Sequence, residues 1–351
     1  MSKCNFTFFD VYFDNLISFI LYFFASASLY ITYLPTKNLF NLKISLYLFN
    51  TPDSILLYYI FYFIIKKDYS YGTGGIGIMQ NNKAKNLNFT EILSNEPDNI
   101  LSLDVSSVKT LQIGYQAETL FLHKATDDTL TIKEYINGLT GSEYYAKVTA
   151  NRFKTTIRYG RREAVNPATC IEIFLPDSYN GELLLSSQYG NIMTDADWKV
   201  ERFAAETTEG SISLNTITAP RIRLVSSTSL IHITKAEGFT DIHSVSGAII
   251  ADDIKGGAKL ATSSSPIQAT FTSLNNIVEC ETLNGNIQLL LPENTGMKID
   301  GISKRGKIFS DIEGLSIKEK PGNVQNITGI LGEKPFQNVR ISTINGDISL
   351  K

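Results

Sequence analysis

Aspartates recur at one position of a repeating pattern in the second half of this chain, and paired carboxylates are the groups that hydrolyse glycosidic bonds. Asp195, Asp252 and Asp311 each stand five residues after a recurring glycine. If each recurrence marks one coil of stacked strands about 4.8 Å thick, neighbouring members of this series are three coils, or about 14 Å, apart. Carboxylates that act on one bond lie roughly 5 to 9.5 Å apart. The three aspartates are therefore predicted to shape turns.

Metal binding is also weakly supported by spacing. The pairs Asp195/Asp197 and Asp252/Asp253 supply oxygen ligands, but aspartates at corners are ordinary turn chemistry. The three histidines of the chain stand at different positions of the repeat, so they form no ligand set of the kind that zinc requires. We expect no metal site and no cofactor.

Hydroxyl side chains recur as well, and Ser263–Ser265 form a run of three. A serine nucleophile needs a base beside it, and none is visible here. An ice-binding array needs regular neighbours, which this column lacks. No catalytic residue is predicted, and the chain is expected not to be an enzyme.

The elements that carry these residues follow from one phrase, Ser/Thr-x-x-Gly/Ser-x-Ile, which recurs between residues 183 and 351. Successive copies are 18 to 21 residues apart, except that the last two are 40 apart and are expected to enclose one degenerate copy. Such a period is typical of stacked repeats. The anchors of the repeat are Gly190, Ile192, Gly210, Ile212, Ile231, Gly247, Ile249, Ile267, Gly285, Ile287, Gly306, Ile308, Gly346 and Ile348.

Apolar residues also recur five and seven positions before each anchor glycine, which is the two-residue period of a strand. Each copy is therefore predicted as strand, corner and strand, with the glycine supplying a residue that tolerates positive φ at the corner. One copy cannot bury its own apolar face, whereas stacked copies close a continuous core. The prediction is an all-β chain folded as a β-solenoid, because an antiparallel sandwich would not require the same residue type in every copy.

Residues 79–182 are predicted to be the irregular N-terminal part of the same solenoid, and residues 183–351 its regular repeats. An end coil has to cover the core, so it departs from the consensus. Residues 86–94 fit either a short helix or a first strand. The strands expected here are Ile100–Val105, Thr110–Ile113, Thr119–His123, Thr129–Ile132, Lys154–Arg158 and Cys170–Leu175.

The first 78 residues differ in composition, because they hold 11 of the 20 phenylalanines and 10 of the 17 tyrosines. Leu16–Leu34 is free of charge and long enough to span a bilayer, and Ser54–Ile65 is a shorter apolar run. Two interpretations stay open: a membrane anchor, or upstream sequence translated in error, with the native start at Met79. The protein is expected at the cell envelope in the first case and in the cytoplasm in the second.

Composition excludes some classes of partner. The net charge is −3 and no basic patch is present, so no nucleic acid is expected. Cys170 and Cys280 stand at apolar strand positions, which predicts buried free thiols.

A resemblance to a known family is carried by Ile173–Pro176, Gly181–Ser187 and Gly190–Ile192, by the iterated Gly-x-Ile corners and by the ending Asn345–Leu350. In these residues the chain resembles the bacterial adhesin-like family called the toastrack domain. The resemblance covers roughly residues 100–351. It implies a β-solenoid, usually bacterial and often associated with the envelope, in a family of unknown function. It brings no catalytic residues.

We therefore expect a binding or scaffold module of the adhesin type, with a protein or glycan as ligand. The alternative is a carbohydrate-active β-helix enzyme, a polysaccharide lyase or a glycoside hydrolase. An outward cluster of aromatic and acidic side chains would mark a ligand face, and the sequence indicates one only weakly, around Tyr144, Tyr145, Tyr159, Tyr179 and Tyr189.

The final copy, Ser342–Lys351, leaves no later segment to cover it. Its free strand edge is therefore predicted to support a homodimer or to accept a strand from a partner.

Overall fold

The computed structural model describes residues 28–31, 44–47, 93–139, 141–160, 169–293 and 295–351. The chain divides into two units, Met1–Lys83 and Ala84–Lys351. In the first, β1 (Ser28–Ile31) pairs antiparallel with β2 (Ile44–Tyr47). The rest of the two apolar runs, and most of 86–94, lie outside the described residues. Among those described, no helix is long and apolar enough to cross a membrane. The domain boundary at residue 78 stays a prediction.

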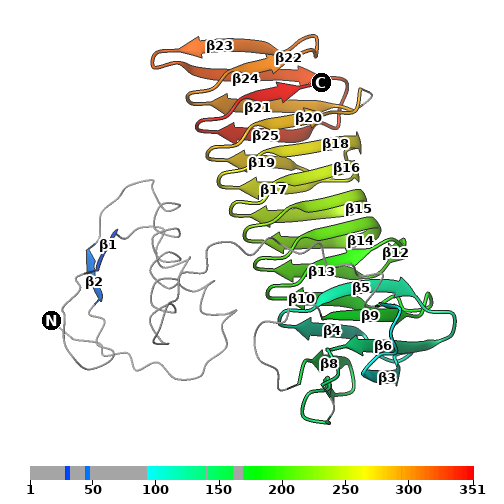
Figure 1. Ribbon diagram of the computed structural model, residues 1–351. Helices are drawn as coiled ribbons and strands as arrows, with labels where there is room; N and C mark the ends of the chain where they lie inside the picture. The colour runs from blue at the N-terminus through cyan, green and yellow to red at the C-terminus, as the bar shows by residue number, and fades with distance from the viewer. Residues whose placement is uncertain (1–27, 32–43, 48–92, 140, 161–168, 294) are drawn as a thin grey trace. The chain divides into compact units, whose positions relative to one another are not determined.

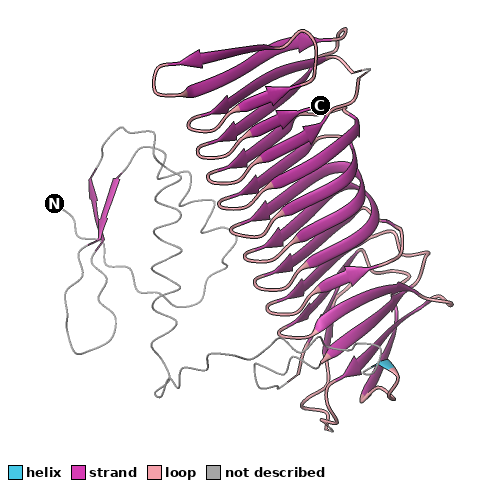
Figure 2. Cartoon of the chain, turned by 45° about the horizontal axis from the view of Figure 1, so that its top comes forward, coloured by secondary structure: helices cyan, strands magenta, loops and turns pink. Residues whose placement is uncertain are grey.

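The second unit is a stack of parallel coils, each with a first strand, a corner and a second strand (Figures 1 and 2). The first strands of the regular coils are β10 (Glu182–Ser187), β13 (Arg202–Thr207), the later parts of β14 (Ile212–Ser226) and β15 (Ile231–Ser244), β17 (Ala258–Thr262) and β19 (Val278–Thr282). The second strands are β11 (Ile192–Thr194), the early parts of β14 and β15, β16 (Ile249–Lys255), β18 (Ile267–Ser273) and β20 (Ile287–Leu290). A short β12 (Trp198–Lys199) also pairs with β14. The predicted β-solenoid is confirmed.

The core is built by the apolar columns of the repeat. Ile192, Ile212 and Ile231 follow one another in register across β11, β14 and β15, and each is fully buried. The columns on the first strands are buried in the same way, with Leu183, Phe203 and Ile222 in one row. Alternate residues along each strand therefore point inward, and every coil adds the same layer to one core.

The Ser/Thr of all corners but one is a buried hydrogen-bonding link between coils; at the remaining corner, Ser244 accepts from the amide of Gly247. Ser187 Oγ accepts the amide hydrogen of Gly190 at 3.0 Å and donates to the carbonyl oxygen of Glu118 in the neighbouring coil at 2.9 Å. The same two bonds recur at Thr207, Ser226, Thr262, Thr282, Ser303 and Thr343, except that the amide bond is not seen at Thr262. A hydroxyl is needed at this position because it satisfies one donor and one acceptor that no strand pairs.

The anchor glycines are required for a reason other than the predicted one. None of them has positive φ; the return bends use that conformation instead, at Gly238 and Gly256. A Cβ at Gly210 would overlap the carbonyl oxygen of Gly190 in the next coil, and the other anchor glycines face the same obstacle. These six corners are therefore glycine because successive backbones approach too closely there for a side chain, whereas serine stands at the other two, Ser229 and Ser265.

The C-terminal coil does not lie at the end of the stack. Its strands β25 (Gln337–Thr343) and β26 (Ile348–Leu350) are inserted between β19–β20 and the coil formed by β21 (Met297–Ser303) and β22 (Ile308–Ser310). Figure 1 shows β25 between β19 and β21. The predicted free edge at Ser342–Lys351 is therefore wrong, because both sides of this coil are paired, and dimerisation or strand addition through it is excluded.

The predicted degenerate copy between Gly306 and Gly346 is also wrong. This segment forms an antiparallel hairpin of β23 (Ser316–Lys320) and β24 (Val324–Leu331), and β24 pairs antiparallel with β21. The hairpin closes the first-strand row of the stack beyond β21. Because the C-terminal coil is inserted between β20 and β22, Asp252 and Asp311 are four coils apart, not three.

The N-terminal end has the same exchanged order. The coil of β4 (Thr110–Tyr115) and β5 (Thr119–Lys124) lies between the coil of β8 (Lys154–Arg158) and β9 (Cys170–Leu175) and the coil of β10 and β11. The antiparallel strands β3 (Asn99–Asp104), β6 (Thr129–Tyr135) and β7 (Lys147–Ala150) cap this end. All six strands expected in this part are present, and only β7 was not predicted.

Candidate functional site

The second strands near the N-terminal end carry an outward cluster of aromatic and charged side chains. We call it the aromatic–acid cluster, and its members are Phe121, His123, Lys133, Tyr135, Glu172, Phe174 and Asp195. His123 on β5 stands opposite Phe174 on β9, while Asp195 follows β11 on the other side of β5. These residues point outward because Leu122, Ile173 and Thr194, which alternate with them, are buried.

The imidazole of His123 lies at the centre of the cluster. Its ring is 5.2 Å from that of Phe174, with 29° between the planes. Its Nδ1 lies 3.7 Å from Oδ1 of Asp195, and its Nε2 lies 3.7 Å from Oε1 of Glu172. Neither contact is a hydrogen bond, and Nε2 is buried without a hydrogen-bond partner among the described residues. The ring is therefore held between two carboxylates by packing.

Glu172 is the most engaged member of the cluster. Tyr135 Oη donates to its Oε2 at 2.8 Å, and Lys133 Nζ lies 4.0 Å from the same oxygen. The ammonium of Lys133 also sits 4.6 Å from the centre of the Phe174 ring, within cation–π range. Burial and the Glu172 carboxylate raise the pKa of Tyr135, so its hydroxyl stays protonated and keeps donating.

The cluster can bind a polar ligand, but the described residues offer no metal centre. Asp195 is its most accessible acid, with 84% of the side chain exposed, whereas 13% of Glu172 is exposed. Flat rings, carboxylates and an ammonium together provide apolar contact, acceptors and a donor. Nowhere in the described parts do three or more His, Cys, Asp or Glu side chains converge as metal ligands do.

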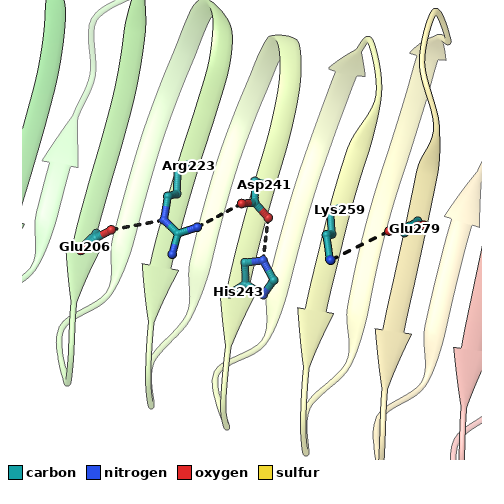
Figure 3. Close-up of polar contacts among 6 residues, drawn as sticks. All are labelled: Glu206, Arg223, Asp241, His243, Lys259 and Glu279. Atoms are coloured by element: carbon teal, nitrogen blue, oxygen red, sulfur yellow. Dashed lines mark hydrogen bonds and ion pairs between the residues drawn. The ribbon is translucent and has the colours of Figure 1, made fainter. Parts of the chain in front are cut away.

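The first strands carry a second ordered feature, a row of alternating charges that we call the charge row. In stacking order its members are Arg223, Asp241, Lys259, Glu279, Arg340 and Asp300. Arg223 lies 3.2 Å from Asp241 and Lys259 lies 4.0 Å from Glu279 (Figure 3). Because each charge is neutralised by its neighbours, the row links coils and offers no net charge to a ligand.

Asp241 is the most perturbed carboxyl of the charge row. Partial burial opposes its ionisation, but the hydrogen bond to His243 at 2.6 Å and the charges of Arg223 and Lys259 outweigh burial (Figure 3). The pKa of Asp241 is therefore held below its usual range.

The residues weighed from sequence are mostly dispersed. Of the repeat aspartates, only Asp195 joins the aromatic–acid cluster; Asp252 lies 2.7 Å from His232, and Asp197 accepts a hydrogen bond from Asn215 at 2.9 Å. Cys170 and Cys280 are buried free thiols, as predicted, and burial raises the pKa of Cys170 to about 12.

Only two of the five tyrosines that indicated a ligand face from sequence are exposed. Tyr144 and Tyr145 pack partly against the core, Tyr179 is buried, and Tyr159 and Tyr189 are each 38% exposed. The alternating segments around His123 and Phe174 contained an outward aromatic signal. Their shared neighbour Asp195 could not be found without the coil order.

Comparison with known proteins identifies a family model described as Toastrack DUF4097, which matches residues 109–351. No curated protein is similar enough to the chain to count as a match. Among solved structures, a putative cell adhesion protein from Clostridium sporogenes is similar with 11% identity and a TM-score of 0.25, covering 72% of this chain and 97% of that one. A putative adhesin from Bacteroides fragilis is similar with 10% identity and a TM-score of 0.38, covering 72% and 96%. The strand register described above therefore rests on the pairings within this chain and not on these two structures.

Proposed function

Because the chain belongs to the Toastrack DUF4097 family, we propose that it is a non-enzymatic binding or scaffold module whose ligand face is the aromatic–acid cluster. The observation that carries this proposal is the position of His123 between Phe174 and Asp195 on an outward sheet face. Paired backbones on both sides of β5 hold these side chains rigidly, so little entropy is lost when a ligand binds.

The chemistry of the cluster suits an adhesive contact. Aromatic rings offer flat apolar area, which packs against the C–H face of a sugar or against a side chain of a partner protein. The carboxylate of Asp195 accepts hydrogen bonds at the edge of that area, and the ammonium of Lys133 donates them.

The alternative of a carbohydrate-active enzyme is less well supported by the same geometry. A glycosidase holds the scissile bond between its two carboxylates. Here the imidazole of His123 occupies the space between Glu172 and Asp195, with 3.7 Å to each. Glu172 is also engaged by Tyr135 and Lys133, which leaves it poorly placed to protonate a leaving group.

A glycan array probed with the full chain, together with a reducing-sugar assay on the glycans that bind, tests the proposal. Asp195→Asn and Phe174→Ala should abolish retention on the array, whereas Gln268→Ala, an exposed residue on the same face, should not. Release of reducing sugar that is lost in Asp195→Asn would establish the enzyme instead. Retention unchanged in both cluster variants would remove the cluster as the ligand face.

The cellular location of this module depends on whether residues 1–78 are part of the native protein. We propose attachment at the cell envelope if residues 1–78 belong to the native protein, and a cytoplasmic position if translation starts at Met79. Sequencing the N-terminus of the native protein distinguishes the two.

A further inference from the structure

A hollow of about 460 Å³ lies on the first-strand face at the N-terminal end of the stack. We call it the Gly114 hollow. Its volume falls in the range of small-molecule sites. The described residues that line it are Gln112, Gly114, Tyr115, Arg158, Tyr159 and Ser186.

Gly114 forms the floor of this hollow for lack of a side chain. It lies in register between Arg158 on β8 and Ser186 on β10. Its φ is not positive, so the backbone conformation does not demand glycine. A Cβ there would lie 2.9 Å from Ser186 Oγ, so any larger residue would fill the space between the two strands. A glycine inside a strand often marks a place where a ligand approaches the backbone closely.

Arg158 differs from two other arginines of this face, Arg223 and Arg340, which form ion pairs. Arg223 pairs with Glu206 and Asp241, and Arg340 pairs with Glu279. Arg158 is exposed and has no carboxylate within ion-pair distance in the described part of the chain. The described lining of the hollow contains no acidic side chain at all. The guanidinium is therefore available for an external anion, and its fork matches a carboxylate.

We propose that the Gly114 hollow binds an acidic sugar of the uronate class, whose carboxylate pairs with Arg158. Gln112 and Ser186 add an amide and a hydroxyl to the lining of the hollow, and these groups exchange hydrogen bonds with sugar hydroxyls. Tyr159, 38% exposed, adds an aromatic surface at the rim for the sugar ring. The site lies on the first strands, separate from the aromatic–acid cluster on the second strands, so it extends the proposed function without depending on it.

Titration of the full chain with free glucuronate and galacturonate, followed by ligand-observed NMR, tests the site; glucose and galactose are the matched neutral probes. The uronates bind and the neutral sugars do not. Arg158→Gln weakens uronate binding at least tenfold, the value of one charge-assisted pair of about 1.5 kcal/mol. The control Arg221→Gln, an exposed arginine of the same face outside the hollow, leaves binding unchanged.

Three more variants test whether the uronate binds in the hollow itself. Gly114→Ala fills the hollow and weakens uronate binding. This variant is used if its thermal unfolding remains cooperative, and Gln112→Ala replaces it if the unfolding does not. Asp195→Asn leaves uronate binding intact, so failure of the aromatic–acid cluster and failure of this site are distinguishable. The proposal is overturned if uronate and neutral sugar bind equally, if neither binds, or if Arg158→Gln leaves uronate binding unaffected. It is also overturned if a short peptide binds in preference to the uronates through its C-terminal carboxylate and in a way that depends on Arg158.

Discussion

The guanidinium of Arg340 lies 3.3 Å from the carboxylate of Glu279, although 61 residues separate them in the chain. On its other side Arg340 stands in register with Asp300. If the coils stacked in chain order, Glu279 would lie beside Asp300, and two like charges would face each other across neighbouring strands. The inserted C-terminal coil replaces that repulsion with an alternating row.

Reversing the charge of Arg340 should therefore cost more than removing it. Arg340→Ala loses an exposed ion pair and should lower the free energy of unfolding by under about 1 kcal/mol. Arg340→Glu places three acids in succession and should lower it further, and added salt should recover the difference because it screens exposed charges. Urea unfolding at low and high salt measures both effects. Equal losses in the two variants, independent of salt, would contradict the charge row.

The inserted position of β26 predicts the effect of proline at Ser349. Both edges of β26 are paired, so Ser349→Pro should break a ladder bond inside the stack and cost on the order of 2 to 4 kcal/mol. The matched control is Ser316→Pro, at the first residue of the outermost strand β23, which should cost under about 1 kcal/mol. Thermal unfolding of both variants gives the answer. An unchanged melting temperature for Ser349→Pro would mean that this coil is terminal after all.

The isoleucine column predicts a contrast between inward and outward neighbours. Ile249 and Ile287 are buried, so truncation of either to alanine should cost about 2 to 5 kcal/mol. Gln268→Ala and Gln288→Ala, at exposed positions of the same strand row, should each change stability by under about 0.5 kcal/mol. Chemical denaturation of the four variants tests this, and similar losses at both kinds of position would refute the column.

The corner hydroxyl predicts a loss that packing alone would not cause. Thr343→Val keeps the shape of the side chain but leaves the Gly346 amide and the Gly285 carbonyl without their partner. Unsatisfied buried groups cost about 1 to 3 kcal/mol. Ser342→Ala removes an adjacent, less buried hydroxyl and is the control. Denaturation curves that coincide for the two variants would show that the corner bonds contribute little.

Asp241 predicts a pH dependence of stability. Its pKa is lower in the folded chain than the ordinary value of 3.8, so its contribution is full above that value and is lost as the pH falls below it through the folded pKa. His243, Arg223 and Lys259 are the charged partners that face it. Asp241→Asn should therefore be less stable than the wild type at neutral pH, and the gap should narrow near pH 3. A gap that stays constant across this range would rule the carboxylate out as its source.

Much of this architecture was accessible from sequence because every regular coil repeats one environment. An inward isoleucine, a corner hydroxyl and a close backbone approach recur at each period. The repeat in the sequence therefore corresponds directly to the repeat of coils in the structure. The same reasoning assigned the wrong cause to the corner glycines, because close approach between coils and positive φ select the same residue.

Only the tertiary structure decided the order of the coils at the two ends. Strands of equal length and alternation can stack in any order, so the sequence of one coil does not name its neighbours. The exchanged order places His123 beside Asp195, Gly114 between Arg158 and Ser186, and Arg340 beside Glu279. Both candidate binding sites and the charge row therefore arise from contacts across coils, which no local pattern encodes.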